Sequence, residues 1–100
     1  MPNKLRLYLT PKAEDDLEEI YFYTLNEWGF DQADLYQDII SAGMMALKLH
    51  PEVGKLFQTK NGAYRTLSIK KHIIYYTLED KQIIVVRILH GSMDRERWID

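Results

Sequence analysis

The N-terminal third of the chain changes from an apolar period of two to a period near 3.6. Residues 5–9 read LRLYL, which places three leucines on one face of a strand. From Pro11 onward apolar residues recur every three or four positions, at Ala13, Leu17, Ile20, Tyr21, Leu25 and Trp28. This spacing predicts an amphipathic helix. Thr10 and Pro11 are a typical N-cap and first helical residue.

A second helix is predicted immediately after the first. Gly29 suits the left-handed conformation that often ends a helix, and Asp31 is a candidate N-cap for the next one. Its apolar stripe is Ala33, Tyr36, Ile40, Gly43, Met44 and Leu47. Pro51 prevents continuation. Because the connection is short, we expect an antiparallel helical hairpin.

The C-terminal half predicts a β-meander. Residues 51–62 are rich in turn formers and are expected to be a loop, and strand-like runs follow at 64–69, 72–78 and 83–89. The last run is apolar on both faces except at Arg87, which is typical of a central strand. We expect residues 5–9 to pair beside it. The prediction is therefore an α+β fold, a four-stranded antiparallel sheet with the helical hairpin on one face.

Composition restricts the class of protein. The chain has 100 residues, 46% of them hydrophobic and 28% charged, which predicts one globular domain over residues 1–100. It has no cysteine, so disulfides and cysteine-based metal sites are excluded. We find no apolar run of membrane-spanning length and no apolar leader, and we expect a cytoplasmic protein without membrane contact. The net charge of −2 argues against sequence-specific DNA binding.

Candidate chemistry is sparse. The histidines at positions 50, 72 and 90 stand apart and match no metal-binding spacing, so neither a metal nor a cofactor is predicted. His90 ends a buried strand beside Gly91 and either anchors a turn or acts as a general base. His72 is expected at a surface or strand edge. The acidic run at 14–19 is expected to be a solvated helix face, with attraction for a basic partner as the alternative.

Several motifs, taken in order, resemble the ParE branch of the RelE/ParE toxin superfamily. They are LTPKAEDDLEEIYFYTLNEWG at residues 9–29, Tyr64-Arg65, His72-x-Ile74-x-Tyr76, and Ile84-x-Val86-x-x-Leu89-His90-Gly91 followed by Met93-Asp94. The resemblance extends from Leu9 to Trp98. It implies a two-layer RelE/ParE-like sandwich and the toxin of a bacterial type II toxin–antitoxin pair. The implied partners are DNA gyrase, through its GyrA component, and a cognate ParD-like antitoxin that wraps an extended segment across the toxin in a hetero-oligomer.

The alternative is a RelE-like ribosome-dependent mRNA endonuclease. RelE-like relatives use basic residues with Tyr, His or Glu on the open sheet face and C-terminal segment; here Arg65, Arg87 and His90 would carry that reaction. An RNase must attract a polyanion, yet the net charge is −2. After Gly91 the only aromatic residue is Trp98, whose indole N–H can only donate. We therefore favour inhibition by binding and assign no catalytic residue.

Two surfaces are predicted from these considerations. The antitoxin is expected on the helical hairpin, at Leu17, Tyr21, Tyr36 and Ile40. The target is expected at the C-terminal end, at His90, Asp94, Arg95, Arg97 and Trp98. Two structural alternatives stay open. Arg65 and Arg87 could pair with Asp94 and tie the tail to the sheet, and Trp98 could fold back over the open sheet face.

Overall fold

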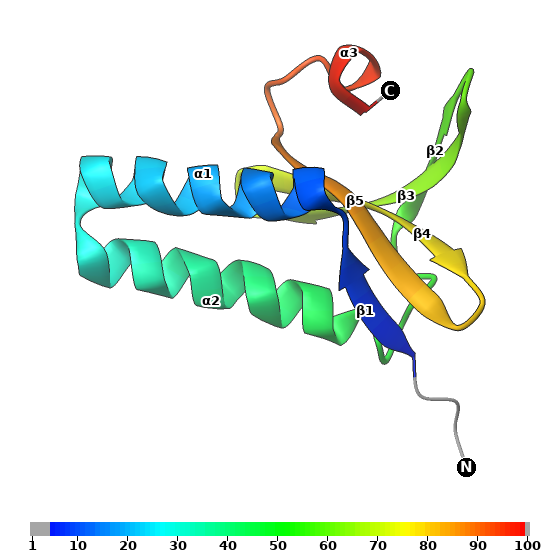
Figure 1. The fold of residues 1–100 in the computed structure, drawn as a ribbon, viewed down its shortest axis with the longest axis horizontal. Coiled ribbons are helices and arrows are strands. Elements are labelled where there is room, and N and C mark those ends of the chain that lie inside the picture. The colour runs from blue at the N-terminus through cyan, green and yellow to red at the C-terminus, as the bar shows by residue number, and fades with distance from the viewer. Residues whose placement is uncertain (1–4, 100) are drawn as a thin grey trace.

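A computed structural model describes residues 5–99, apart from the side chains of Arg95 and Glu96. The elements are β1 (Arg6–Leu9), α1 (Pro11–Trp28), α2 (Phe30–Ala46), β2 (Lys55–Thr59), β3 (Gly62–Ile69), β4 (His72–Glu79), β5 (Gln82–His90) and α3 (Arg95–Ile99). The strands form one sheet in the order β1-β5-β4-β3-β2, and the α1–α2 hairpin packs against it (Figure 1). The predicted α+β class and helical hairpin are confirmed. Within the described chain, every helix is too short or too polar to cross a membrane.

The predicted four-stranded antiparallel sheet is wrong in two respects. Residues 55–59, predicted as loop, form β2 and pair antiparallel with β3, so the sheet has five strands. β1 pairs with β5 in parallel, from Arg6 opposite Gln82 to Leu9 opposite Val85. Only strands joined by a tight turn must be antiparallel. Two helices and three strands lie between β1 and β5 in the chain, so their connection does not require them to be antiparallel.

The helix ends show how the hairpin is positioned. Thr10 caps α1 as predicted, its Oγ1 accepting from the Ala13 N–H at 3.1 Å. The same hydroxyl donates to the Val86 carbonyl at 3.0 Å, which fixes α1 to β5. Gly29 has φ +91 and separates the two helices by one residue. The predicted Asp31 cap is wrong, because this tight reversal starts α2 at Phe30 and leaves Asp31 inside the first turn.

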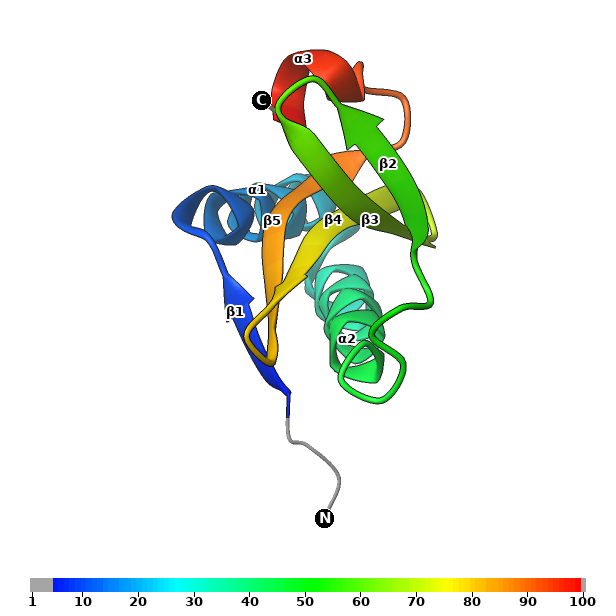
Figure 2. The same ribbon diagram turned by 90° about the vertical axis from the view of Figure 1, so that its right-hand side faces the viewer.

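Two apolar cores lie on opposite faces of the sheet. The core beneath the helices contains Ala13, Ile20, Ile40, Met44, Leu47, Ile74, Tyr76, Ile83, Val85 and Ile88. The second core contains Tyr75, Leu89 and Ile99, with Phe57, Tyr64, Ile73, Val86 and Met93 around it, and α3 contributes to it (Figure 2). A β-bulge makes Tyr76 oppose Val85 while Tyr75 opposes Arg87. The face opposite the hairpin is therefore partly covered.

Candidate functional site

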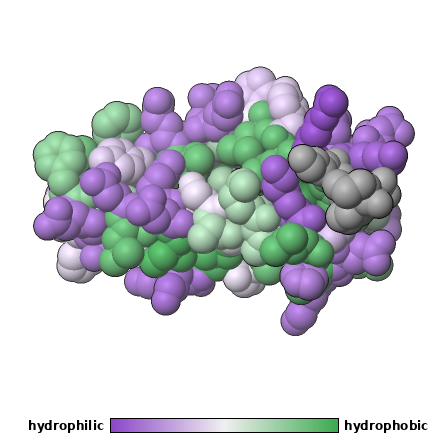
Figure 3. Space-filling view, turned by 90° about the horizontal axis from the view of Figure 1, so that it is seen from below, coloured by the Kyte–Doolittle hydropathy of each residue, from purple (hydrophilic) through white to green (hydrophobic). Residues whose placement is uncertain are grey.

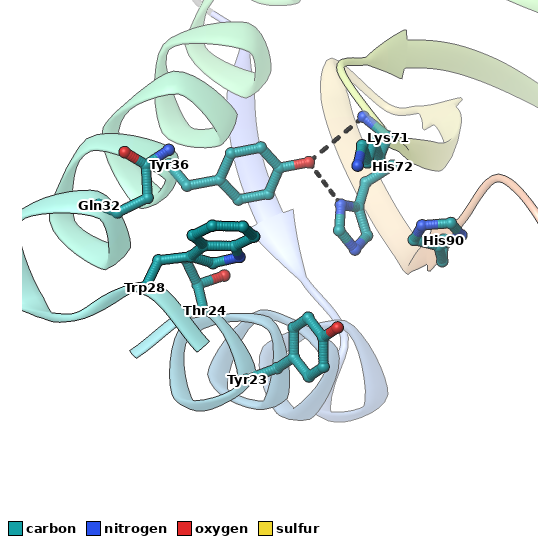
Figure 4. A pocket seen from close by; sticks show the side chains of 8 residues that line it. All are labelled: Tyr23, Thr24, Trp28, Gln32, Tyr36, Lys71, His72 and His90. Carbon is teal, nitrogen blue, oxygen red and sulfur yellow. Dashed lines mark hydrogen bonds between the residues drawn. The ribbon is translucent and has the colours of Figure 1, made fainter. Parts of the chain in front are cut away.

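A cavity lies between the helical hairpin, the start of β4 and the end of β5. It measures about 520 Å³, and we call it the hairpin groove. Its lining residues are Tyr23, Thr24, Trp28, Gln32, Tyr36, Lys71, His72 and His90 (Figure 4). Three aromatic rings therefore face a set of nitrogen-bearing side chains. Trp28 was assigned to the apolar stripe of the first helix but is 72% exposed, because it lies at the end of α1 beyond the sheet (Figure 1).

A short hydrogen-bond chain forms one wall of the groove. The Tyr36 hydroxyl lies 2.6 Å from Nδ1 of His72 and accepts the Lys71 backbone N–H at 3.3 Å. Burial, and to a smaller extent the nearby His90, lowers the pKa of His72 to about 4. Burial also raises the pKa of Tyr36. At neutral pH this wall therefore presents uncharged His72 and Tyr36 side chains.

His90 lies beside His72 at the end of β5. The two residues are a cross-strand pair, and their ring centroids are 5.3 Å apart. Nδ1 of His90 accepts the Ser92 backbone N–H at 3.1 Å and lies 2.8 Å from the Ser92 hydroxyl. The Gly91 N–H donates to the Lys71 carbonyl at 2.8 Å. Of the two roles left open for His90, this is the geometry of a turn anchor.

Arg87 joins three elements. Its Nε and Nη2 donate to the two carboxylate oxygens of Asp16, each at 2.7 Å, and its Nη1 donates to the Trp98 carbonyl at 2.8 Å. The Ile88 N–H donates to Asp16 at 2.9 Å. The hydrogen bonds that Arg87 donates to the Asp16 carboxylate raise the pKa of Arg87. In the alternative left open by the sequence, Arg87 paired with Asp94; its carboxylate partner is Asp16 instead. Asp16, expected on a solvated face, is only 9% exposed because the guanidinium neutralises it.

The three residues proposed for a nuclease are not gathered into one cluster. Nη1 of Arg65 donates to the carbonyls of Gly54 and Glu52, at 3.0 and 3.2 Å. Arg65 pairs with Tyr76 in the middle of β4, whereas His90 pairs with His72 at the start of that strand. These two partners are four residues apart, roughly 13 Å along a strand. Arg65 and Arg87 are both occupied by structural hydrogen bonds.

The four residues predicted for the antitoxin differ in accessibility. Tyr36 lines the hairpin groove, and Leu17 is half-buried against the core. The Tyr21 hydroxyl donates to Asp34 across the hairpin at 2.8 Å, which raises the pKa of Tyr21. Ile40 is fully buried and has no surface for a partner to contact.

Sequence reasoning missed most of the groove. Its lining comes from both helices and from the ends of β4 and β5, and no local motif reports that convergence. His72, expected at a surface or strand edge, is half-buried, and Tyr36 of α2 packs against it. The Lys70-Lys71 pair was visible in the sequence, but only as the boundary between two strands.

The predicted target surface divides between two places. His90 lines the groove, whereas Ile99 of α3 is buried in the core on the opposite sheet face. Asp94, Arg97 and Trp98 are exposed, Trp98 at 44%. The Arg95 side chain lies outside the described residues. In one of the alternatives left open, Trp98 folded back over the sheet face opposite the hairpin. The α3 residue buried on that face is Ile99 instead.

The outer side of α2 adds an apolar surface. Leu35 and Met45 are each more than half exposed, and Leu49 follows in the turn after the helix. Figure 3 looks at this side from below and shows apolar side chains gathered along it. Among the residues that the structure describes, none of the His, Asp and Glu side chains form a group of three that could hold a metal ion.

The family model and the similar curated proteins agree on one family. The family described as ParE toxin of type II toxin-antitoxin system, parDE matches residues 7–95. Toxin ParE1 of Mycobacterium tuberculosis is 34% identical over 93 residues, covering 92% of this chain and 95% of that protein. Toxin ParE1 of Caulobacter vibrioides is 28% identical over 86 residues, covering 86% and 88%.

Two solved structures share the fold. A structure entitled "Chromosomal ParDE TA system from P. aeruginosa" superimposes with a TM-score of 0.79 at 21% identity, covering 91% of this chain and all of the other. The hypothetical protein HP0894 from Helicobacter pylori superimposes with a TM-score of 0.58 at 20% identity, covering 88% and 96%.

Proposed function

Because the chain belongs to the ParE toxin family, we propose that it is the toxin of a type II toxin–antitoxin pair and that a cognate ParD-like antitoxin neutralises it. The observation that carries the proposal is the hairpin groove, which opens between the helices and the sheet and is lined by exposed aromatic residues. An extended segment laid in this groove and over the apolar side of α2 would bury an interface of standard size, about 1,600 Å² in total. The solved ParDE system from P. aeruginosa is a fold relative in which such a pair is named.

The target proposed from the family resemblance is DNA gyrase, through its GyrA component. We place the contact on α3 and the residues before it, where Asp94, Arg97 and Trp98 are exposed and where Arg95 lies in the same helix. Arginine and tryptophan are enriched among residues that dominate binding energy. A gyrase-directed toxin acts in the cytoplasm, the location expected from the sequence.

Inhibition by binding fits the side-chain arrangement better than RNA cleavage. A general acid or base must reach the reacting group, and cationic side chains must face the developing charge. Here Arg87 is engaged by Asp16 and Trp98, and Arg65 by two backbone carbonyls. The ribosome-dependent nuclease is thus the second candidate, and it becomes an outcome of the test.

The antitoxin proposal is tested by co-expression with the adjacent small gene. Rescue of growth and a co-purifying complex are expected. Toxicity that persists, with no complex recovered, would contradict the proposal.

The target proposal is tested with purified toxin in two assays, gyrase supercoiling and translation of a defined mRNA. We expect supercoiling to be inhibited and the mRNA to remain intact. A ribosome-dependent cut that disappears in Arg87→Ala or His90→Ala, both still folded, would establish the nuclease instead.

A further inference from the structure

The hairpin groove combines aromatic walls with an excess of hydrogen-bond donors. Tyr23, Trp28 and Tyr36 supply apolar surface, while Lys71 supplies a cation and Gln32 an amide. No carboxylate is among the eight side chains that line it. A negatively charged ligand would therefore meet the Lys71 cation and no repelling carboxylate among these side chains.

The hydrogen-bond partners of the two histidines indicate which ring nitrogen carries the proton. The Tyr36 oxygen accepts the Lys71 N–H and also has a proton to donate, and Nδ1 of His72, 2.6 Å away, is the acceptor that we assign to it. In the neutral ring, the remaining proton then lies on Nε2 of His72. Figure 4 shows this second nitrogen pointing into the cavity.

The same assignment holds for His90. Its Nδ1 accepts the Ser92 N–H, so its ring proton also lies on Nε2. A transition metal would need an unprotonated Nε2 on each ring. The pair is therefore set up as two N–H donors and not as two metal ligands, and with Lys71 they match an anion.

We propose that the hairpin groove binds a side-chain carboxylate of the antitoxin, with the apolar group beside that carboxylate packed between Trp28 and Tyr23. This inference rests on the proposed function, because it places the antitoxin in the groove. A carboxylate fits better than a phosphate group, since one lysine with two neutral imidazoles matches a single negative charge. Charge-assisted hydrogen bonds from Lys71, His72 and His90 would make the carboxylate an anchor of the complex.

The test measures the affinity of the purified antitoxin for toxin variants by titration calorimetry. Lys71→Met removes the groove cation, and Lys70→Met is the matched control. Both lysines are exposed in the same turn, but Lys70 does not line the groove. We expect Lys71→Met to weaken binding at least tenfold and Lys70→Met less than twofold. His90→Ala, at an exposed position, should weaken binding as well.

An acidic-to-amide scan of the antitoxin completes the test. One Asp→Asn or Glu→Gln change should cost at least tenfold against the wild-type toxin and almost nothing against Lys71→Met, which is the sign of a direct pair. If the complex forms but Lys71→Met and Lys70→Met bind alike, the carboxylate anchor is wrong and the proposed function stands. If no complex forms, both fail. Binding of 4-phenylbutanoate in the groove with an antitoxin affinity insensitive to Lys71 would overturn the antitoxin as its source.

Discussion

Asp16 of α1 binds Arg87 of β5 through two hydrogen bonds of 2.7 Å each, across 71 positions of the chain. The two side chains are 11% and 14% exposed, so this pair is largely withdrawn from water. Because Arg87 also holds the Trp98 carbonyl, one guanidinium links the helical hairpin, the sheet and α3.

Breaking this pair from one side should be strongly destabilising. Asp16→Ala leaves a buried guanidinium without its partner, and we expect a loss of about 3–5 kcal/mol in the free energy of unfolding. Asp15→Ala, at the exposed neighbouring position, should change it by less than about 0.5 kcal/mol. Urea denaturation measures both.

The double variant Asp16→Leu with Arg87→Met separates a structural role from a functional one. Replacing both charges by apolar groups should recover much of the lost stability. If Arg87→Ala instead keeps full stability and abolishes toxicity, Arg87 contacts the target directly.

Tyr76 should be the second residue whose polar group matters for stability. Its buried hydroxyl donates to the Pro51 carbonyl at 2.8 Å and accepts the Gly54 N–H at 2.9 Å, which holds the loop before β2. Tyr76→Phe leaves two backbone groups unsatisfied, and we expect a cost of about 1–3 kcal/mol in thermal or urea unfolding. Tyr8→Phe, on the exposed edge strand, should cost almost nothing. Equal stability of the two variants would mean that water replaces the hydroxyl.

Local patterns predicted the helices, and longer-range contacts decided what the sequence could not show. The α1–α2 hairpin follows from apolar periodicity, Thr10 and Gly29, all of which act within a few residues. The buried position of Asp16 depends on a partner 71 residues away, so the acidic run around it looked fully solvated. β2 is short and pairs along only one edge, since it ends the sheet, and its Lys-Leu-Phe-Gln-Thr sequence has little strand signal. The hairpin groove could not be predicted from local patterns, because its lining comes from both helices and from the ends of β4 and β5.

The low pKa of His72 gives stability a specific pH dependence. The folded protein holds this pKa near 4, whereas an unfolded histidine titrates near 6.5. Between these values the unfolded chain binds more protons, so this group lowers the free energy of unfolding as pH falls from about 6.5 towards 4. Urea denaturation at intervals from pH 7.5 to 4.5 should show a shallower decline for His72→Gln than for wild type. His50→Gln, at an exposed position, serves as the control, and identical declines for all three proteins would show that His72 titrates normally.

Trp98 and Ile99 are neighbours on α3 with opposite expected roles. Ile99 is 9% exposed and packs with Tyr75 and Leu89, so Ile99→Ala should cost roughly 2–4 kcal/mol in stability. Trp98 is 44% exposed, and Trp98→Ala should cost less than about 1 kcal/mol because its carbonyl, which holds Arg87, remains. If this helix contacts gyrase, Trp98→Ala should weaken inhibition of supercoiling by roughly 30-fold, the loss typical of a binding hot spot. Urea unfolding and supercoiling titrations on the same preparations measure the two effects. A Trp98→Ala protein that unfolds as readily as Ile99→Ala while inhibiting gyrase normally would make Trp98 a structural residue and move the target contact elsewhere.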